Sequence, residues 1–91
     1  MQKTIDIVIT NKLGLHARAA AKLTQLASQY TDCDIYIARA QQRVNAKSIM
    51  GVMMLAAGLG VTVNVDATGA QAEEALAAIR QLFEDKFGEP E

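Results

Sequence analysis

Four short segments of the chain alternate apolar and polar residues, as strands with one buried face do. In residues 4–10 the apolar side consists of Ile5, Ile7 and Ile9. The other three alternating segments are residues 34–38, 43–46 and 61–66. The pattern therefore predicts four strands, of which the last alternates most regularly.

Three further segments repeat apolar residues at helical spacing, which predicts helices over residues 17–30, 49–56 and 72–87. The apolar stripe of the first helix consists of Ala19, Ala20, Leu23, Leu26, Ala27 and Tyr30, and that of the last consists of Ala72, Ala75, Leu76, Ile79, Leu82, Phe83 and Phe87. Gly88 and Pro90 are expected to end the last helix, with Lys86 in its final turn.

The resulting order, β-α-β-β-α-β-α, predicts an α+β fold in one domain that spans residues 1–91. Two strand-then-helix units joined in this way imply a four-stranded antiparallel sheet. Three helices would cover one face of this sheet and leave the other face toward solvent. Such a ferredoxin-like pattern hosts many unrelated functions, so the fold alone identifies none of them.

Composition narrows the classes of partner and compartment. The net charge of −1 argues against nucleic acid as the main partner. Cys33 is the only cysteine, so no internal disulfide can form, which favours the cytoplasm. No signal-peptide pattern follows Met1, and the longest apolar stretch, residues 49–59, is too short to insert into a membrane.

Basic and acidic residues are unevenly distributed along the chain. Residues 1–50 carry seven Lys or Arg and three Asp, whereas residues 51–91 carry two basic and seven acidic residues. Small domains often segregate charge in this way on an ordinary solvated surface. The alternative is a basic face around His16 that meets an acidic protein or an anion.

His16, the only histidine, stands immediately before the first predicted helix and two residues before Arg18. An imidazole nitrogen can act as a nucleophile at neutral pH, and the first N–H groups of a helix have no intrahelical acceptor. A phosphoryl group on the ring would lie near the N–H groups of Ala17, Arg18 and Ala19. The alternative is that His16 is only a polar cap, although Asn or Ser would cap better.

The short middle helix is the second unusual segment. Ser48 stands at its N-cap position, where it is either a simple cap or a site that tolerates phosphate. The helix has more apolar residues than one buried face requires, so Met50 and Met54 either fill gaps in the core or face solvent. One His and one Cys cannot form a protein-only zinc site with nitrogen and sulfur ligands, and no conventional catalytic triad is supported.

Two motifs together resemble those of the HPr family, the histidine-containing phosphocarriers of the bacterial phosphotransferase system. Residues 11–18, Asn-Lys-Leu-Gly-Leu-His-Ala-Arg, resemble the family's active-site motif. Residues 45–53, Asn-Ala-Lys-Ser-Ile-Met-Gly-Val-Met, resemble its regulatory-serine motif. The segment 67–76 fits either ordinary HPr or the nitrogen-related branch, NPr.

The resemblance implies a phosphoryl carrier rather than a turnover enzyme. Enzyme I, or its nitrogen-branch paralogue, would phosphorylate His16 at Nδ1, and the group would pass to a histidine of an enzyme IIA domain. Arg18 would assist the transfer, and the amides of Ala17 and Arg18 would hold the phosphate. The resemblance further implies a monomer that needs no cofactor or metal. The implied docking residues are Leu15, Lys47, Ile49, Met50 and Met53.

One position departs from the family pattern, and one implied role depends on the host. The family usually has proline after the arginine, whereas this chain has Ala19, which predicts a competent but less rigid site. In some bacteria an HPr kinase/phosphorylase modifies the position of Ser48 and blocks docking.

Two other functions stay open: a regulatory docking module controlled by phosphorylation at His16 or Ser48, and a small-molecule sensor.

Overall fold

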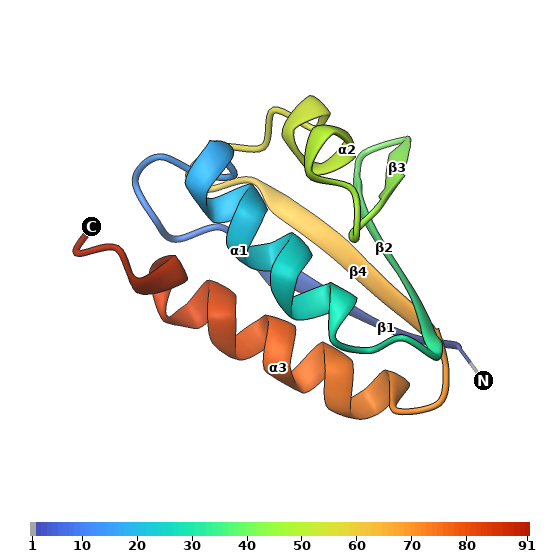
Figure 1. Cartoon of the computed structure of the whole chain (residues 1–91). Coiled ribbons are helices and arrows are strands. Elements are labelled where there is room, and N and C mark those ends of the chain that lie inside the picture. Colours follow the sequence, from blue (N-terminus) through green and yellow to red (C-terminus); the bar gives the residue numbers. More distant parts are fainter. Residues whose placement is uncertain (1) are drawn as a thin grey trace.

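The computed structural model describes residues 2–91 and contains one sheet of four strands (Figure 1). The strands are β1 (Gln2–Val8), β2 (Cys33–Arg39), β3 (Gln42–Asn45) and β4 (Thr62–Gly69). Their spatial order is β1-β4-β2-β3, and every neighbouring pair is antiparallel. The helices are α1 (Ala17–Ser28), α2 (Ile49–Met54), α3 (Ala72–Glu84) and a short 3-10 helix, η1 (Lys86–Gly88). The predicted α+β fold and element order are confirmed; Met1, which the predicted domain includes, lies outside the described residues.

β1 and β4 pair along their whole length, from Gln2 opposite Thr68 to Val8 opposite Thr62. The pairing places β1 two residues earlier than predicted and extends β4 to Gly69. Ile9 follows β1 but stays attached to the sheet, because its N–H donates to the Val61 carbonyl at 2.9 Å. The sheet therefore holds the chain up to the start of the loop that carries His16.

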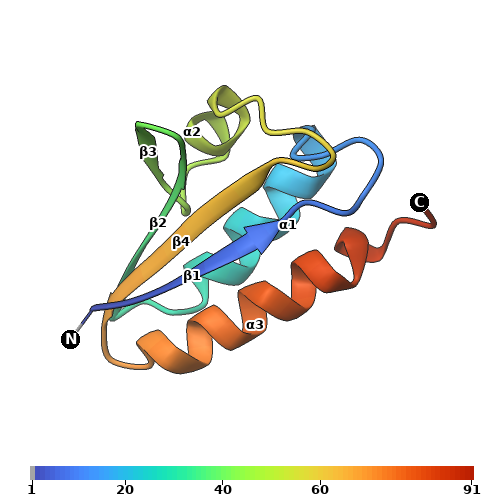
Figure 2. The same cartoon turned by 180° about the vertical axis from the view of Figure 1, so that it is seen from behind.

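The core lies between the sheet and the helices, and α1 and α3 run side by side across one sheet face (Figures 1 and 2). The apolar faces of the strands and the stripes of the helices both point into this layer. Its fully buried members include Ile35, Ile37, Val63, Val65, Ala20, Leu23 and Ile79. Burying each of the large aliphatic side chains stabilises the fold by about 1.5–3 kcal/mol.

The last helix ends earlier than predicted. α3 stops at Glu84, and Lys86 and Phe87 adopt left-handed backbone conformations with φ of 54° and 56°. The expectation that one helix runs to Phe87 with Lys86 in its last turn is therefore wrong, because two left-handed residues cannot continue a right-handed helix. The break turns the chain after Gly88 toward the start of α1.

No helix of residues 2–91 covers the other face of the sheet (Figure 2). On this face the buried carboxylate of Asp66 forms an ion pair with Arg43. Asp66 accepts hydrogen bonds from Arg43 Nε at 3.0 Å and Nη2 at 2.7 Å. The Arg43 guanidinium also lies over the Tyr36 ring, 3.9 Å from its centroid. The bidentate pair satisfies Asp66, which is only 4% exposed, so this cluster has a structural role.

Candidate functional site

His16 is the N-cap residue of α1, with φ −73° and ψ −179°, but its ring does not cap the helix. The backbone carbonyl of His16 accepts the first helical hydrogen bond from the Ala20 N–H at 2.8 Å. The His16 side chain is 28% exposed, while Ala17 and Arg18 beside it are exposed. The imidazole is therefore available for chemistry at the end of a helix where N–H groups lack intrahelical acceptors.

The loop before His16 is fixed by contacts with the segment that follows α2. The Leu15 N–H donates to the Ala57 carbonyl at 2.9 Å. Gly14 adopts φ +65°, and a Cβ at this position would lie 2.5 Å from the Ala57 oxygen. Only glycine fits both the conformation and the close approach, so the glycine two residues before His16 has a defined structural reason.

The structure brings a carboxylate to His16 that no pattern in the sequence indicated. Glu89 Oε2 lies 2.5 Å from His16 Nε2, and Glu89 Oε1 accepts a hydrogen bond from Asn11 Nδ2 at 3.0 Å. The Glu89 side chain is 10% exposed. Burial alone would raise the pKa of Glu89, but the hydrogen bonds from His16 and Asn11, together with the charges of His16 and Arg18, outweigh burial and lower this pKa below its ordinary value.

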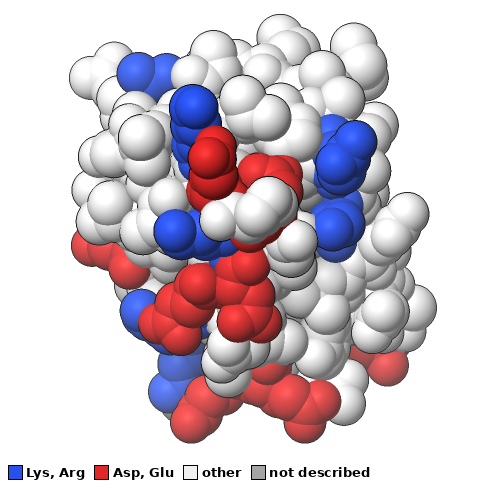
Figure 3. Space-filling view, turned by 90° about the vertical axis from the view of Figure 1, so that its left-hand side faces the viewer, with Lys and Arg blue, Asp and Glu red and all other residues white. Residues whose placement is uncertain are grey.

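A hollow of about 540 Å³ opens beside the ring. It is lined by Lys12, Leu13, His16, Ala17, Arg18, Glu89, Pro90 and Glu91. The view of this end in Figure 3 shows acidic groups among Lys and Arg. The face around His16 is therefore of mixed charge, and the predicted basic face is modified by the C-terminal segment.

The predicted docking residues differ in exposure: three are exposed, Leu15 is buried and Lys47 is half-buried. Ile49, Met50 and Met53 are exposed on α2, and Met50 is 67% exposed. Leu15 is only 4% exposed, because its loop packs against the core, so it offers little surface to a partner. Lys47 is also drawn inward, since its Nζ donates to the carbonyls of Tyr30 at 2.8 Å and Cys33 at 2.6 Å.

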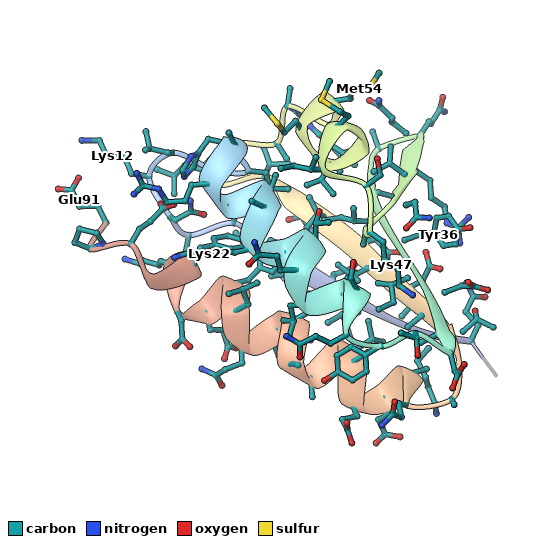
Figure 4. All side chains as sticks on the ribbon, viewed as in Figure 1. Lys12, Lys22, Tyr36, Lys47, Met54 and Glu91 are labelled. Carbon is teal, nitrogen blue, oxygen red and sulfur yellow. The ribbon has the colours of Figure 1, made fainter. Side chains whose placement is uncertain are left out.

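Two exposed apolar residues near these positions were not among the predicted docking residues. Leu13 is 66% exposed and lines the hollow beside His16. Met54 is equally exposed and lies at the outer side of α2 (Figure 4). The open alternatives for the methionines are settled, because Met50 and Met54 both face solvent rather than fill gaps in the core.

Ser48 caps α2 as predicted. Its Oγ accepts a hydrogen bond from the Gly51 N–H at 3.1 Å, and the residue is exposed. Across residues 2–91 no group of three or more His, Cys, Asp or Glu could hold a metal ion. The same residues include no helix that is long and apolar enough to cross a membrane.

A family model described as "PTS HPr component phosphorylation site" matches residues 3–85, which include both motifs and nearly the whole sheet. The chain belongs to the HPr family. HPr proteins are phosphocarriers of the phosphotransferase system, so the chain is a relay component of that system rather than a classical enzyme.

Individual HPr relatives cover nearly the whole chain. The phosphocarrier protein HPr of Cupriavidus necator is 52% identical over 94% of this chain and 96% of its own length. HPr of Neisseria meningitidis is 45% identical over all of this chain and 99% of its own. The phosphocarrier protein NPr of Shewanella violacea is also 45% identical, over 92% of this chain and 91% of its own. HPr and NPr relatives therefore resemble the chain to similar degrees.

Solved HPr structures share the fold. The crystal structure of HPr-C-His from Thermoanaerobacter tengcongensis has a TM-score of 0.93 and 45% identity, and covers 98% of this chain and 99% of its own. An HPr dimer from the same organism has a TM-score of 0.77 and 46% identity, over 96% of this chain and 99% of its own. That second structure shows that at least one HPr relative is found as a dimer.

Proposed function

We propose that His16 accepts a phosphoryl group from phospho-enzyme I at Nδ1 and passes it to a histidine of an enzyme IIA domain. The observation that carries this proposal is a partly exposed imidazole at the start of α1 that leaves the capping position of its own helix unused. The N–H groups of Ala17 and Arg18 would bind the phosphoryl oxygens. The Arg18 side chain, exposed at the same hollow, would add a charge-assisted hydrogen bond.

The docking surface in this proposal is the exposed part of α2. Ile49, Met50 and Met53 provide an apolar surface, and α2 packs against α1, which begins directly after His16. Methionine side chains adapt to different partners, which suits a carrier that meets both a donor and an acceptor. The carrier would act as a cytoplasmic monomer without a cofactor, and each transfer requires fast dissociation, which a small interface permits.

Incubation with enzyme I and phosphoenolpyruvate tests the carrier function. We expect one acid-labile phosphoryl adduct per chain, detected by mass spectrometry. The His16→Ala variant should form no adduct and should keep its circular dichroism spectrum, because the ring makes no capping hydrogen bond. The proposal would be refuted if the His16→Ala variant still formed the adduct. It would also be refuted if the native chain formed no adduct with a cognate enzyme I.

Regulation through Ser48 is a second candidate, and its exposure at the start of the docking helix favours it. Phosphorylation there by an HPr kinase/phosphorylase would place negative charge next to Met50 and hinder docking. Ser48→Asp and Ser48→Asn both retain a good N-cap, but only the first adds charge. We expect slower transfer from phospho-enzyme I in Ser48→Asp alone. Equal rates in the two variants would exclude a charge effect at this position.

A further inference from the structure

The C-terminal segment is held against the start of α1 by contacts on both sides of Glu89. Lys22 Nζ donates to the Phe87 carbonyl at 2.5 Å, and the Lys12 N–H donates to the Glu91 carbonyl at 3.1 Å. Lys12 and Glu91 also form an exposed ion pair at 3.5 Å (Figure 4). Phe87 itself is buried in the core. Contacts at Phe87 and at Glu91 therefore fix the segment on both sides of Glu89 and hold Glu89 beside His16.

The two oxygens of Glu89 have different partners, and this determines where the imidazole hydrogen lies. Oε1 accepts from Asn11 Nδ2, and Asn11 is fully buried and also donates to the Gly14 carbonyl at 2.8 Å. Oε2 faces His16 Nε2 at 2.5 Å. An ionised carboxylate can only accept hydrogen bonds. Nε2 must therefore carry the hydrogen, which leaves the lone pair of the neutral ring on Nδ1.

We propose that Glu89 is a positioning residue that holds His16 in the tautomer whose Nδ1 is the nucleophile. This inference rests on the proposed phosphocarrier function and adds a residue to it. When the Nδ1 lone pair attacks the phosphorus, the new N–P bond forms as the bond between phosphorus and the donor nitrogen breaks. The electron pair of the broken bond leaves with the donor. His16 loses no proton, so the phosphorylated ring is an imidazolium, and the Glu89 carboxylate stabilises its positive charge.

The same cationic form favours the onward transfer. A ring that keeps its Nε2 hydrogen leaves as neutral imidazole when the N–P bond breaks toward an acceptor, with the electron pair returning to Nδ1. Glu89 touches Nε2, on the opposite side of the ring from the reacting nitrogen. Glu89 therefore acts by keeping the hydrogen on Nε2, so that the ring leaves as neutral imidazole rather than as an anion.

Because Asn11 donates to Glu89, the Glu89→Gln variant is expected to reverse the tautomer of His16. In Glu89→Gln, Asn11 Nδ2 still requires an oxygen, so the amide of residue 89 would turn its NH₂ group toward His16. His16 Nε2 would then have to accept, and the hydrogen would move to Nδ1, where it blocks attack. Glu89→Ala leaves the ring free to adopt either tautomer. Glu91→Gln is the matched control, because it keeps the backbone hydrogen bond from Lys12 and removes only an exposed ion pair, which contributes little to stability.

Nitrogen-15 NMR of the full-length variants measures the tautomer directly, at about pH 9, where imidazole is ordinarily neutral. We expect a pyridine-like Nδ1 in the native chain and in Glu91→Gln, and a pyrrole-like Nδ1 in Glu89→Gln. Phosphoramidate, a small phosphoryl donor that releases ammonia, then measures nucleophilicity without partner docking. Acceptance should fall by about tenfold or more in Glu89→Gln, with Glu89→Ala between it and the native chain.

Each result has one interpretation. The inference is overturned if Glu89→Gln matches Glu91→Gln in tautomer, or if the tautomer changes and the phosphoramidate rate does not. The native chain could fail to accept phosphate from phospho-enzyme I while the phosphoramidate rates of the variants still rank as expected. That result would refute the proposed relay and leave the role of Glu89 standing.

Discussion

The rings of Phe83 and Phe87 meet edge to face, with centroids 4.8 Å apart, although the helix that contains Phe83 ends between them. Both side chains are 1% exposed. The contact between the Phe83 and Phe87 rings holds the left-handed turn of residues 86–87 against the core. Phe87 is thus both a core residue and the anchor of the segment that carries Glu89.

Loss of the Phe87 ring should lower stability and release the C-terminal segment. Phe87→Ala is expected to reduce the free energy of unfolding by about 3–5 kcal/mol, the usual cost of a large core truncation. Phe87→Leu, which keeps most of the volume, should cost less than about 1.5 kcal/mol. Urea denaturation measures both values. Equal costs in the two variants would show that Phe87 does not act through packing.

Gly14→Ala should be destabilising for two reasons. The left-handed conformation strains an alanine, and the new Cβ would lie 2.5 Å from the Ala57 oxygen and 2.6 Å from Gly58 Cα. We expect a loss of at least about 1–3 kcal/mol in urea denaturation. Gly58→Ala is the control, because a Cβ there meets nothing within 4 Å. If both variants were equally stable, the close approach between the two loops would be excluded.

Ala19→Pro tests whether the departure from the family motif loosens the site. Ala19 is the third residue of α1, so its N–H has no intrahelical acceptor and proline removes no helical hydrogen bond. A fixed φ should raise stability by about 0.4–1 kcal/mol and speed transfer from phospho-enzyme I. Thermal denaturation and single-turnover transfer measure the two effects. An unchanged transfer rate would remove the rigidity hypothesis. Because Ala19 is fully buried, any change in stability alone would then be an effect of the proline ring on packing.

The attachment of Glu89 should depend on pH in a defined direction. Its pKa lies below the ordinary value of 4.5, against the effect of burial, because of the hydrogen bonds from His16 and Asn11 and the nearby charges of His16 and Arg18. A depressed pKa in the folded state means that the stabilisation is present above pH 4.5 and is lost as the pH falls through the folded value. The carbon-13 resonance of the Glu89 carboxyl should therefore titrate below 4.5, while Asn11→Ala should move the midpoint upward. A midpoint above 4.5 in the native chain would contradict the contacts.

Periodicity predicted most of the fold because the sheet and two long helices each bury one regular face. Ala72, Ile79 and Phe83 recur at helical spacing, and Val63 and Val65 alternate, so their common environment is visible in the sequence. His16 was found by its place at a helix start. The burial of Leu15 could not be predicted, because it depends on the distant Ala57 segment, which no local pattern indicates.

Glu89 could not be predicted for a similar reason. It is 73 residues from His16 in the chain, and its direction depends on left-handed conformations at Lys86 and Phe87. Neither residue type favours such a conformation, so the sequence indicated a continuing helix. Gly88 and Pro90 did indicate that a helix ends nearby, but not where the chain goes next.

The return of the chain to His16 governs how this protein can be handled. Any residues fused after Glu91 would emerge at the rim of the hollow beside His16, which the phosphoryl group enters in the proposed transfer, whereas β1 begins at the opposite end of the molecule (Figure 1). An affinity tag, fluorophore or surface tether at the C-terminal side would compete with Glu89 and with the proposed donor and acceptor proteins. The same label ahead of β1 would leave the path of the phosphoryl group clear.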